Sequence, residues 1–370
     1  MTTQTETPRA AAPSTRSLRT FLPVAIGVVV VVFAALLPLL NLQIPGILPD
    51  ATYMPGSLAL LSLCMVFAAL ALSYNMLLGT AGMLSFGHAL YFGAGAYGLG
   101  IILENLGIPL FPGVFLALVG GLVIAFVTGA IAMRVSGIPF AMVTLAFAQA
   151  GSVWVRRNQE ITGGEEGLQL PTEHVPDALV GVINTRNLYW VILAILVIVY
   201  LVSLWVDSSR LGAVARATRE NELRVRVLGL SPYWAKLGLF LIAAACASLA
   251  GVGYMLLQSG TQPRAISADL TITVLVMVVL GGVGFRWGAI VGGVIYTLLD
   301  QRLTVLAGSE AVQSLPDILR IPLSEPLFIL GVLFILVVMF LPGGIAGTVD
   351  KLTRRRDQHR DVALESVTAD

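Results

Sequence analysis

The apolar stretches of this sequence contain very few side chains that could do chemistry. His88 is the one ionisable residue well inside an apolar run, whereas Asp269, Asp300 and Glu325 lie at the expected ends of such runs. An imidazole in that position either hydrogen-bonds a passing substrate or links two helices. A carrier driven by ions usually needs ionisable ligands inside its spans, so their scarcity indicates that energy comes from elsewhere.

The sequence also lacks the motifs of a self-contained catalyst. It has no Gly-x-x-x-x-Gly-Lys-Ser/Thr phosphate loop, no nucleophile elbow and no His-Glu-x-x-His pair. Cys64 and Cys246 lie inside apolar runs and the three histidines are far apart, so we expect neither a disulfide nor a metal site. We therefore expect a protein that is not an enzyme, binds no cofactor itself and relies on a separate subunit for any use of ATP.

Composition places the chain in a membrane. Of 370 residues, 57% are hydrophobic and 12% are charged, which is half of the about 25% charge found in soluble domains. This excludes a soluble enzyme, a disordered scaffold and a nucleic-acid-binding protein. Because a helix crosses a bilayer with about 20 apolar residues, we expect an all-α, polytopic bundle. The ten expected crossings are 21–40, 57–79, 82–102, 110–133, 137–155, 188–206, 236–257, 269–283, 287–306 and 324–341.

The distribution of basic residues predicts the orientation of this bundle. With ten crossings, most arginines and lysines fall on the same side as both termini, and basic residues favour the cytoplasmic side. The membrane domain, 21–348, then lies between a disordered cytoplasmic tail, 1–20, and a polar cytoplasmic tail, 349–370. The short run 269–283 forms either a tight hairpin with the next run or a broken helix.

Small residues recur at a spacing of four in two distant stretches, each after a Leu-Gly pair. This favours an internal duplication, although generic packing of membrane helices gives the same spacing. Nearby glycines allow irregular backbone, which membranes tolerate where it is buried in protein or lines a cavity. The two series are Ser85, Ala89, Gly93, Tyr97 and Gly284, Gly288, Gly292, Tyr296. The predicted pathway residues are Gly79, Gly82, Ser85, Gly87, His88, Gly281, Gly282, Gly284 and Gly288.

Two loops are long enough to have functions of their own. The outer loop, 156–187, contains a run from Thr162 to Leu168 made of Thr162, Gly163, Gly164, Glu165, Glu166, Gly167 and Leu168. The inner loop, 207–235, is dense in charge, and residues 216–228 predict one short helix with charge pairs four residues apart. Its apolar stripe is Leu223, Val227 and Leu230, and its end is Gly229. This helix either docks another subunit or rests on anionic lipid.

Four stretches together resemble the permease subunits of branched-chain amino acid ABC transporters, in particular their M-type subunit. They are 75–88, 162–168, 219–237 and 279–288. The resemblance covers about residues 55–345. Departures from the family pattern include Ala289, Glu165-Glu166 and the valines Val225 and Val227.

The resemblance implies an importer in the bacterial inner membrane, driven by alternating access. It implies a homologous H-type permease, two ATP-binding subunits and a periplasmic substrate-binding protein as partners, all working in a lipid bilayer. It assigns coupling to the ATPase to Arg219, Glu220, Glu222, Arg224 and Gly229. Substrate class stays open between branched-chain or related amino acids and urea, amides or aromatic acids. The alternative is a self-sufficient secondary transporter or channel.

Overall fold

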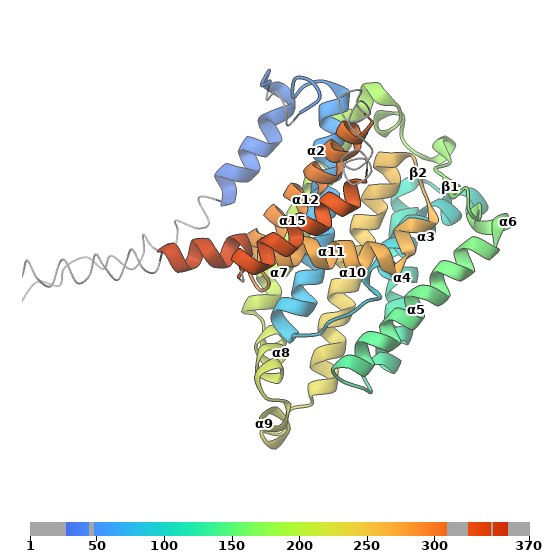
Figure 1. Ribbon diagram of the computed structural model, residues 1–370. Coiled ribbons are helices and arrows are strands. Elements are labelled where there is room, and N and C mark those ends of the chain that lie inside the picture. The colour runs from blue at the N-terminus through green and yellow to red at the C-terminus, as the bar shows by residue number, and fades with distance from the viewer. Residues whose placement is uncertain (1–26, 44–47, 309–324, 342, 354–370) are drawn as a thin grey trace, which may run out of the picture.

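Helices make up nearly all of the computed structural model, which describes residues 27–43, 48–308, 325–341 and 343–353 (Figure 1). An apolar helix, Gly27–Leu39, precedes the bundle. The long helices that follow are α2 (Pro55–Asn75), α3 (His88–Leu106), α4 (Leu110–Ala132), α5 (Ile138–Arg157), α7 (Thr185–Ser208), α10 (Pro232–Gln258), α11 (Ala268–Gly281), α12 (Arg286–Ala307) and α15 (Pro326–Phe340). The shorter ones are α6 (Gln159–Thr162), α8 (Arg210–Glu220) and α9 (Glu222–Val227).

The all-α, polytopic prediction is confirmed. Within the described ranges, seven helices are long and apolar enough to cross a membrane, and Gly27–Leu39 and α11 are shorter apolar helices. The remaining expected run, 82–102, lies largely on α3, whose 19 residues span about 28 Å at 1.5 Å per residue. Every expected run therefore coincides with a helix over most of its described residues, while the number of crossings and the side of each terminus stay predictions. The tail 1–20 and most of the tail 349–370 lie outside the described residues.

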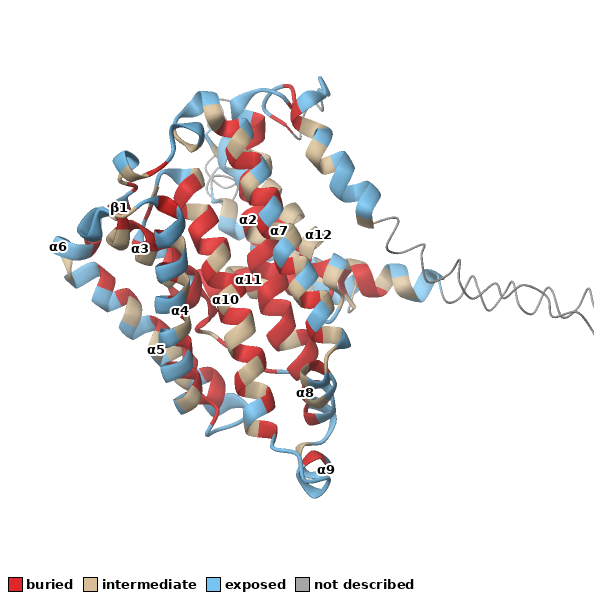
Figure 2. Ribbon diagram, turned by 180° about the vertical axis from the view of Figure 1, so that it is seen from behind, coloured by how far each residue is buried: buried red, intermediate tan, exposed pale blue. Residues whose placement is uncertain are grey.

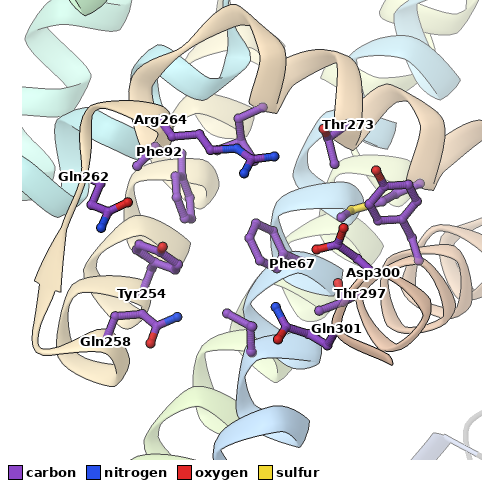
Figure 3. A pocket seen from close by; sticks show the side chains of 15 residues that line it. Phe67, Phe92, Tyr254, Gln258, Gln262, Arg264, Thr273, Thr297, Asp300 and Gln301 are labelled. Atoms are coloured by element: carbon purple, nitrogen blue, oxygen red, sulfur yellow. The ribbon is translucent and has the colours of Figure 1, made fainter. Parts of the chain in front are cut away.

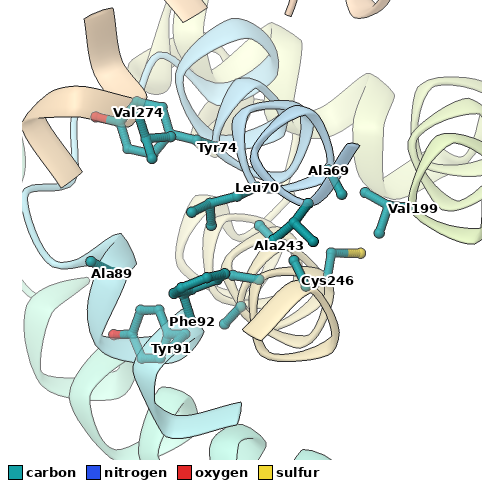
Figure 4. Close-up of a cluster of buried hydrophobic side chains, with 14 of the residues drawn as sticks. Ala69, Leu70, Tyr74, Ala89, Tyr91, Phe92, Val199, Ala243, Cys246 and Val274 are labelled. Atoms are coloured by element: carbon teal, nitrogen blue, oxygen red, sulfur yellow. The ribbon is translucent and has the colours of Figure 1, made fainter. Parts of the chain in front are cut away.

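Two helices form the centre of the bundle. In α2 and α10 the apolar windows are 72% buried, whereas in α4 only 28% is buried. Figure 2 shows the buried residues gathered on these central helices and the exposed ones on the surrounding helices. Side chains of α2, α3, α7, α10 and α11 converge in the core, including Leu70, Phe92, Val199, Ala243 and Val274 (Figure 4). An outer helix that stays apolar on its exposed face is suited to lipid or to another apolar protein surface.

The bundle has two distinct ends. Helices α8 and α9 lie at one end, which we call the α8–α9 end (Figure 1). At the other, strand β1 (Leu168–Gln169) pairs antiparallel with β2 (Gly260–Thr261), and we call this the β-ribbon end. The ribbon joins the loop after α5 to the loop after α10. A two-residue pairing carries no periodic signal, so the sequence did not predict it.

Glycines let several helices approach backbone to backbone. A Cβ atom at Gly251 of α10 would lie 1.9 Å from the carbonyl oxygen of Phe92, and one at Gly95 of α3 would lie 2.0 Å from that of Ser248. Helices α11 and α12 are packed in the same way, because a Cβ at Gly281 would lie 1.9 Å from the carbonyl oxygen of Gly288. Four residues join them, so the run 269–306 is a tight helical hairpin, one of the two expected forms.

The contact between α3 and α10 predicts a stability effect. Gly251→Ala places a methyl group against rigid backbone, and such overpacking costs about 1–3 kcal/mol. We expect a fall of several degrees in the thermal unfolding midpoint of the detergent-solubilised protein. Gly120→Ala is the matched control, because a Cβ at Gly120 of α4 has nothing within 4 Å. Equal midpoints for the two variants would contradict this packing.

Candidate functional site

The two glycine clusters singled out in the sequence meet in the structure. Helix α2 ends at Asn75 and continues as a π-helical turn, η2 (Met76–Thr80), which contains Gly79. The side-chain oxygen of Asn75 accepts a hydrogen bond of 2.9 Å from the backbone N–H of Gly284. A Cβ at Gly79 would lie 2.8 Å from the Cα of Gly284 and 2.8 Å from the Asn75 oxygen. Only glycine fits at Gly79, and π-helical turns are frequent at functional sites.

An arginine from the inner loop reaches the same place. The guanidinium of Arg219, on α8, donates a hydrogen bond to the carbonyl oxygen of Gly79. Gly82 has a φ of +67°, and a Cβ there would lie 2.9 Å from the Arg219 Cγ. We call Asn75, Gly79, Gly82, Arg219 and Gly284 the glycine junction. It joins three segments far apart in sequence, and a hydrogen bond from a charged donor is stronger than a neutral one.

The chain between η2 and α3 runs through the protein as irregular backbone. Helix α3 begins at His88, so residues 82–87 of the expected run 82–102 are not helical. The carbonyl of Ser85 accepts from the Tyr74 hydroxyl at 3.0 Å, and the Phe86 N–H donates to Thr144 Oγ1 at 3.1 Å. A Cβ at Gly87 would lie 2.5 Å from the Thr144 carbonyl oxygen. Apart from the exposed Gly82, the segment is thus buried or half-buried in protein, and side chains bind the Ser85 carbonyl and the Phe86 N–H.

The four-residue repeat is only partly helical. Ala89, Gly93 and Tyr97 lie on α3, as their counterparts lie on α12, but Ser85 and Gly284 precede those helices. The prediction that four small or aromatic residues share one helix face is therefore wrong at the first position of each series, because both helices start later than the pattern suggests. Internal duplication stays a prediction.

His88 links two helices. Its Nε2 lies 2.8 Å from the hydroxyl oxygen of Ser73, which itself donates to the Leu70 carbonyl at 2.7 Å. With the serine proton directed to that carbonyl, Nε2–H is the donor to the serine oxygen. The ring also packs edge-on against Tyr74, 5.3 Å between centroids. These contacts correspond to the interhelical role, one of the two expected for this residue.

A cavity of about 210 Å³ lies on the side of the bundle where α2, α3, α10, α11 and α12 meet (Figure 3). Phe67, Phe92 and Tyr254 line one part of it. Its polar lining is Gln258, Gln262, Arg264, Thr273, Tyr296, Thr297, Asp300 and Gln301. None of the nine predicted pathway residues lines this cavity, so their role in a pathway stays a prediction. Gly281, Gly282 and Gly288 instead pack the α11–α12 hairpin and its neighbours.

Sequence reasoning missed Arg264 and Asp300. Arg264 belongs to η6 (Pro263–Ile266), a short helical turn between β2 and α11. In the sequence it falls between two expected crossings, where only a loop was expected. Asp300 was expected near the end of the run 287–306, but α12 extends seven residues beyond it, to Ala307, which places Asp300 inside the helix. The available signal was one charge of each sign in or beside neighbouring apolar runs, and only the fold shows that the two charges line the same cavity.

The inner loop does not form the single helix predicted for 216–228. Asn221 has an extended backbone, with φ −159° and ψ 102°, which separates α8 from α9. Its side chain caps α9 by accepting from the Arg224 N–H at 3.0 Å. A capping side chain at this position outweighs the helix pattern. Arg216 pairs with Asp207 at 3.2 Å rather than with Glu220, so the expected pairs through Glu220 are absent from the described ion pairs.

Glu222 holds α9 in place. It pairs with Arg226, as predicted, at 2.6 Å, and with Lys236 of α10 at 2.7 Å. Gly229 has φ +78°, and the hydrogen bonds from Gly229 N–H to the Arg226 carbonyl and from Leu230 N–H to the Val225 carbonyl form a Schellman motif. The C′ role predicted for Gly229 is confirmed.

The outward face of α9 is apolar and unpartnered within the described chain. Of the predicted stripe, Leu223 is 70% exposed, Val227 80% and Leu230 47%; Leu228 is also 76% exposed, while Val225 is buried against the bundle. Arg224 is also exposed. The stripe predicted from the sequence therefore points away from the protein's own core.

The outer loop is a set of tight turns at the β-ribbon end. Thr162 is buried and donates to the Val155 and Asn158 carbonyls at 2.5 and 2.7 Å. Gly163, Gly164 and Gly167 have positive φ, and a Cβ at Gly167 would lie 2.2 Å from the Thr261 carbonyl oxygen, which fixes the loop to β2. Glu165 and Glu166 are exposed, and Glu165 lies 3.5 Å from Arg156.

No group of three or more His, Cys, Asp or Glu residues suited to a metal ion occurs in the described ranges. The chain is a polytopic helical membrane protein with a buried backbone junction, a polar cavity and an exposed apolar helix at one end. A family model for the permease component of branched-chain amino acid transport systems matches residues 56–341. The chain belongs to that family.

Relatives carry the same description. The chain is 30% identical over 262 residues to the high-affinity branched-chain amino acid transport system permease protein LivM of Salmonella typhimurium, covering 65% of this chain and 62% of the relative. It is 27% identical over 322 residues to the probable LivM of Methanocaldococcus jannaschii, covering 76% and 90%. LivH of Escherichia coli is 25% identical over 299 residues, covering 76% and 91%. The chain thus spans less than two thirds of the Salmonella relative, and the M-type resemblance is supported.

The Glu222 ion pairs predict a pH effect on α9. The hydrogen bond from Lys236, opposed by partial burial and aided by the bond from Arg226, holds the pKa of Glu222 below its ordinary value of 4.5. A lowered pKa stabilises the folded segment above that ordinary value, and the stabilisation is lost as pH falls through the folded pKa. Hydrogen exchange of the α9 amides, corrected for intrinsic rates, should therefore accelerate below pH 4.5.

At neutral pH, Glu222→Gln should raise the same exchange rates about fivefold, the equivalent of about 1 kcal/mol for one ion-pair network. Glu220→Gln is the control, since Glu220 forms no ion pair among the described residues. Identical exchange in the two variants would contradict the role given to Glu222.

Proposed function

We propose that this chain is the M-type permease subunit of an ABC importer for branched-chain or related amino acids. The observation that carries the proposal is the combination of an exposed apolar helix, α9, with an arginine on the adjoining helix that reaches the glycine junction. The same loop, 207–235, thus contains an exposed surface on which another subunit can act and an arginine that connects this surface to the glycine junction. The family membership supports the same role.

The α8–α9 end then faces the cytoplasm. Its arginines and lysine, including Arg216, Arg226, Lys236 and Arg286, are paired with acidic residues at this end, and basic residues favour the cytoplasmic side. The β-ribbon end and the Thr162–Gly167 loop face the outside, where a periplasmic substrate-binding protein delivers substrate. The location is the bacterial inner membrane.

The partners follow from the family and from this chain's surface. LivM and LivH relatives are both named as permease proteins of branched-chain amino acid systems, which supports pairing with a homologous H-type subunit. Two ATP-binding subunits supply the energy. One of them docks on the α9 face formed by Leu223, Val227 and Leu228, which needs an apolar groove as its counterpart.

The path of force runs through named contacts. Movement of α9 shifts α8, because only Asn221 separates them. Arg219 then pulls on the Gly79 carbonyl in the π-helical turn, and Gly79 moves against Gly284 in the α11–α12 turn. Both turns consist of irregular backbone that can change conformation more readily than a regular helix. Alternating access follows as the hairpin and α2 change their mutual position.

A secondary carrier is the second candidate, and the half-buried carboxyl of Asp300 beside the cavity favours it. Such a carrier needs an ionisable group in the membrane and no ATPase. Uptake by this chain alone, driven by an ion gradient and insensitive to ATP, would establish that reading and refute the importer.

The test uses the complete transporter, with both permeases, the ATP-binding subunits and the binding protein, in proteoliposomes. Wild type should take up L-leucine only with ATP. Leu223→Ser with Val227→Ser should lower uptake and substrate-stimulated ATP hydrolysis at least about tenfold, because an apolar anchor of an interface is lost. Leu223→Met with Val227→Ile keeps the apolar face and should retain both activities. Unchanged uptake in the serine variant would refute docking through α9.

A further inference from the structure

The cavity holds two opposite charges that do not satisfy each other. Arg264 approaches it from η6 and Asp300 from α12, and both side chains point into it (Figure 3). No ion pair joins them in the part of the chain that the structure describes. Asp300 is half-buried, while Arg264 is more exposed, at the outer part of the cavity. Withdrawing a carboxylate from water without a direct partner costs free energy. A ligand that supplies the partner recovers part of that free energy when it binds.

The remaining lining is uncharged. Gln258, Gln262 and Gln301 offer amide donors and acceptors. With one positive and one negative group, the cavity is neutral overall. A ligand with a net charge would satisfy one of the two groups and face the other with like charge, whereas an uncharged ligand such as urea could hydrogen-bond both groups but would neutralise neither charge. Electrostatics therefore favours a ligand that carries both charges.

An apolar surface lies beside these charges. Phe92 is fully buried and its ring lies 6.4 Å from that of Phe67 and 5.3 Å from that of Tyr254. Leu63 and Met277 extend this surface. The volume of about 210 Å³ is far above the roughly 10–15 Å³ that one water needs. An aliphatic side chain fits here by apolar contact alone.

We infer that this cavity binds a neutral amino acid as its zwitterion. The guanidinium of Arg264 takes the α-carboxylate, since its planar fork matches a carboxylate. The carboxylate of Asp300 takes the α-ammonium group, and the side chain packs on Phe67, Phe92 and Tyr254. The inference rests on the proposed function and deepens it, because it assigns the amino-acid substrate to this cavity and its two charged groups to Arg264 and Asp300. The cavity lies toward the β-ribbon end, where substrate enters.

The test measures equilibrium binding of radiolabelled L-leucine to the purified permease–ATPase complex without the binding protein. Arg264→Gln and Asp300→Asn should each weaken binding about tenfold or more, because each removes a charge-assisted contact. Arg264→Lys should retain part of the affinity. Asp269→Asn is the matched control, because Asp269 is an exposed carboxylate in the first turn of α11 and does not line the cavity.

Competition by leucine analogues measures ligand selectivity. A variant that simply misfolds loses binding of all ligands, whereas a variant that lacks one charged contact changes the selectivity. 4-Methylpentanoate lacks the ammonium group and isoamylamine lacks the carboxylate. Relative to leucine, 4-methylpentanoate should compete at least about fivefold better in Asp300→Asn than in wild type. Isoamylamine should likewise compete better in Arg264→Gln. In each case the variant lacks the charged side chain that the analogue would leave unpaired. Unchanged selectivity in both variants, or leucine affinity equal to wild type, would overturn the inference.

ATP-driven uptake by the wild-type complex distinguishes a failure of the cavity assignment from a failure of the proposed importer function. Leucine uptake by wild type combined with unaltered binding in Arg264→Gln and Asp300→Asn overturns the cavity assignment and leaves the importer standing. Absence of ATP-driven uptake refutes the importer, whatever the cavity binds.

Discussion

The architecture depends on backbone segments that approach each other more closely than any side chain allows. Gly79 against Gly284, and Gly281 against Gly288, bring main chain onto main chain, so each pair fixes the distance between two elements. Without the hydrophobic driving force that operates in water, membrane helices associate through such close packing. The same contacts place a turn of α2 directly beside the α11–α12 turn, with Asn75 hydrogen-bonded across the gap. These close backbone contacts therefore also set the relative positions of α2, α11 and α12, which line the cavity.

Charge is distributed to match that framework. Ion pairs gather at the α8–α9 end, where Glu222 and Asp207 each bind two basic side chains. Toward the other end, Arg264 and Asp300 line one cavity without pairing directly. The first group stabilises the exposed apolar helix α9, on which we propose that another subunit docks, and the second is suited to a ligand that carries both charges. Between them, buried polar groups such as His88 Nε2 and the Ser73 hydroxyl hydrogen-bond each other within the protein.

Local sequence patterns predicted the helices and the exposed stripe on α9, because apolar runs and glycine signals are local. The break at Asn221 was missed, since a capping side chain competes with a helix pattern that otherwise continues through it. Ser85 was placed on a helix that starts only at His88, where side chains from α2 and α5 hold the preceding backbone. Arg264 and Asp300 lie 36 positions apart in the numbering, and only tertiary packing makes them neighbours of one cavity.

In the proposed mechanism, Arg219 transmits force from the α8–α9 segment to the glycine junction. The most direct test of this step is the amount of leucine transported per ATP hydrolysed in the reconstituted transporter carrying Arg219→Ala. The account predicts that ATP hydrolysis continues while transport per ATP falls at least about tenfold, because the docking face is intact and the link to Gly79 is lost. Arg216→Ala, which removes a pair with Asp207 at the same end, should keep the wild-type ratio. A wild-type ratio in Arg219→Ala would contradict the account.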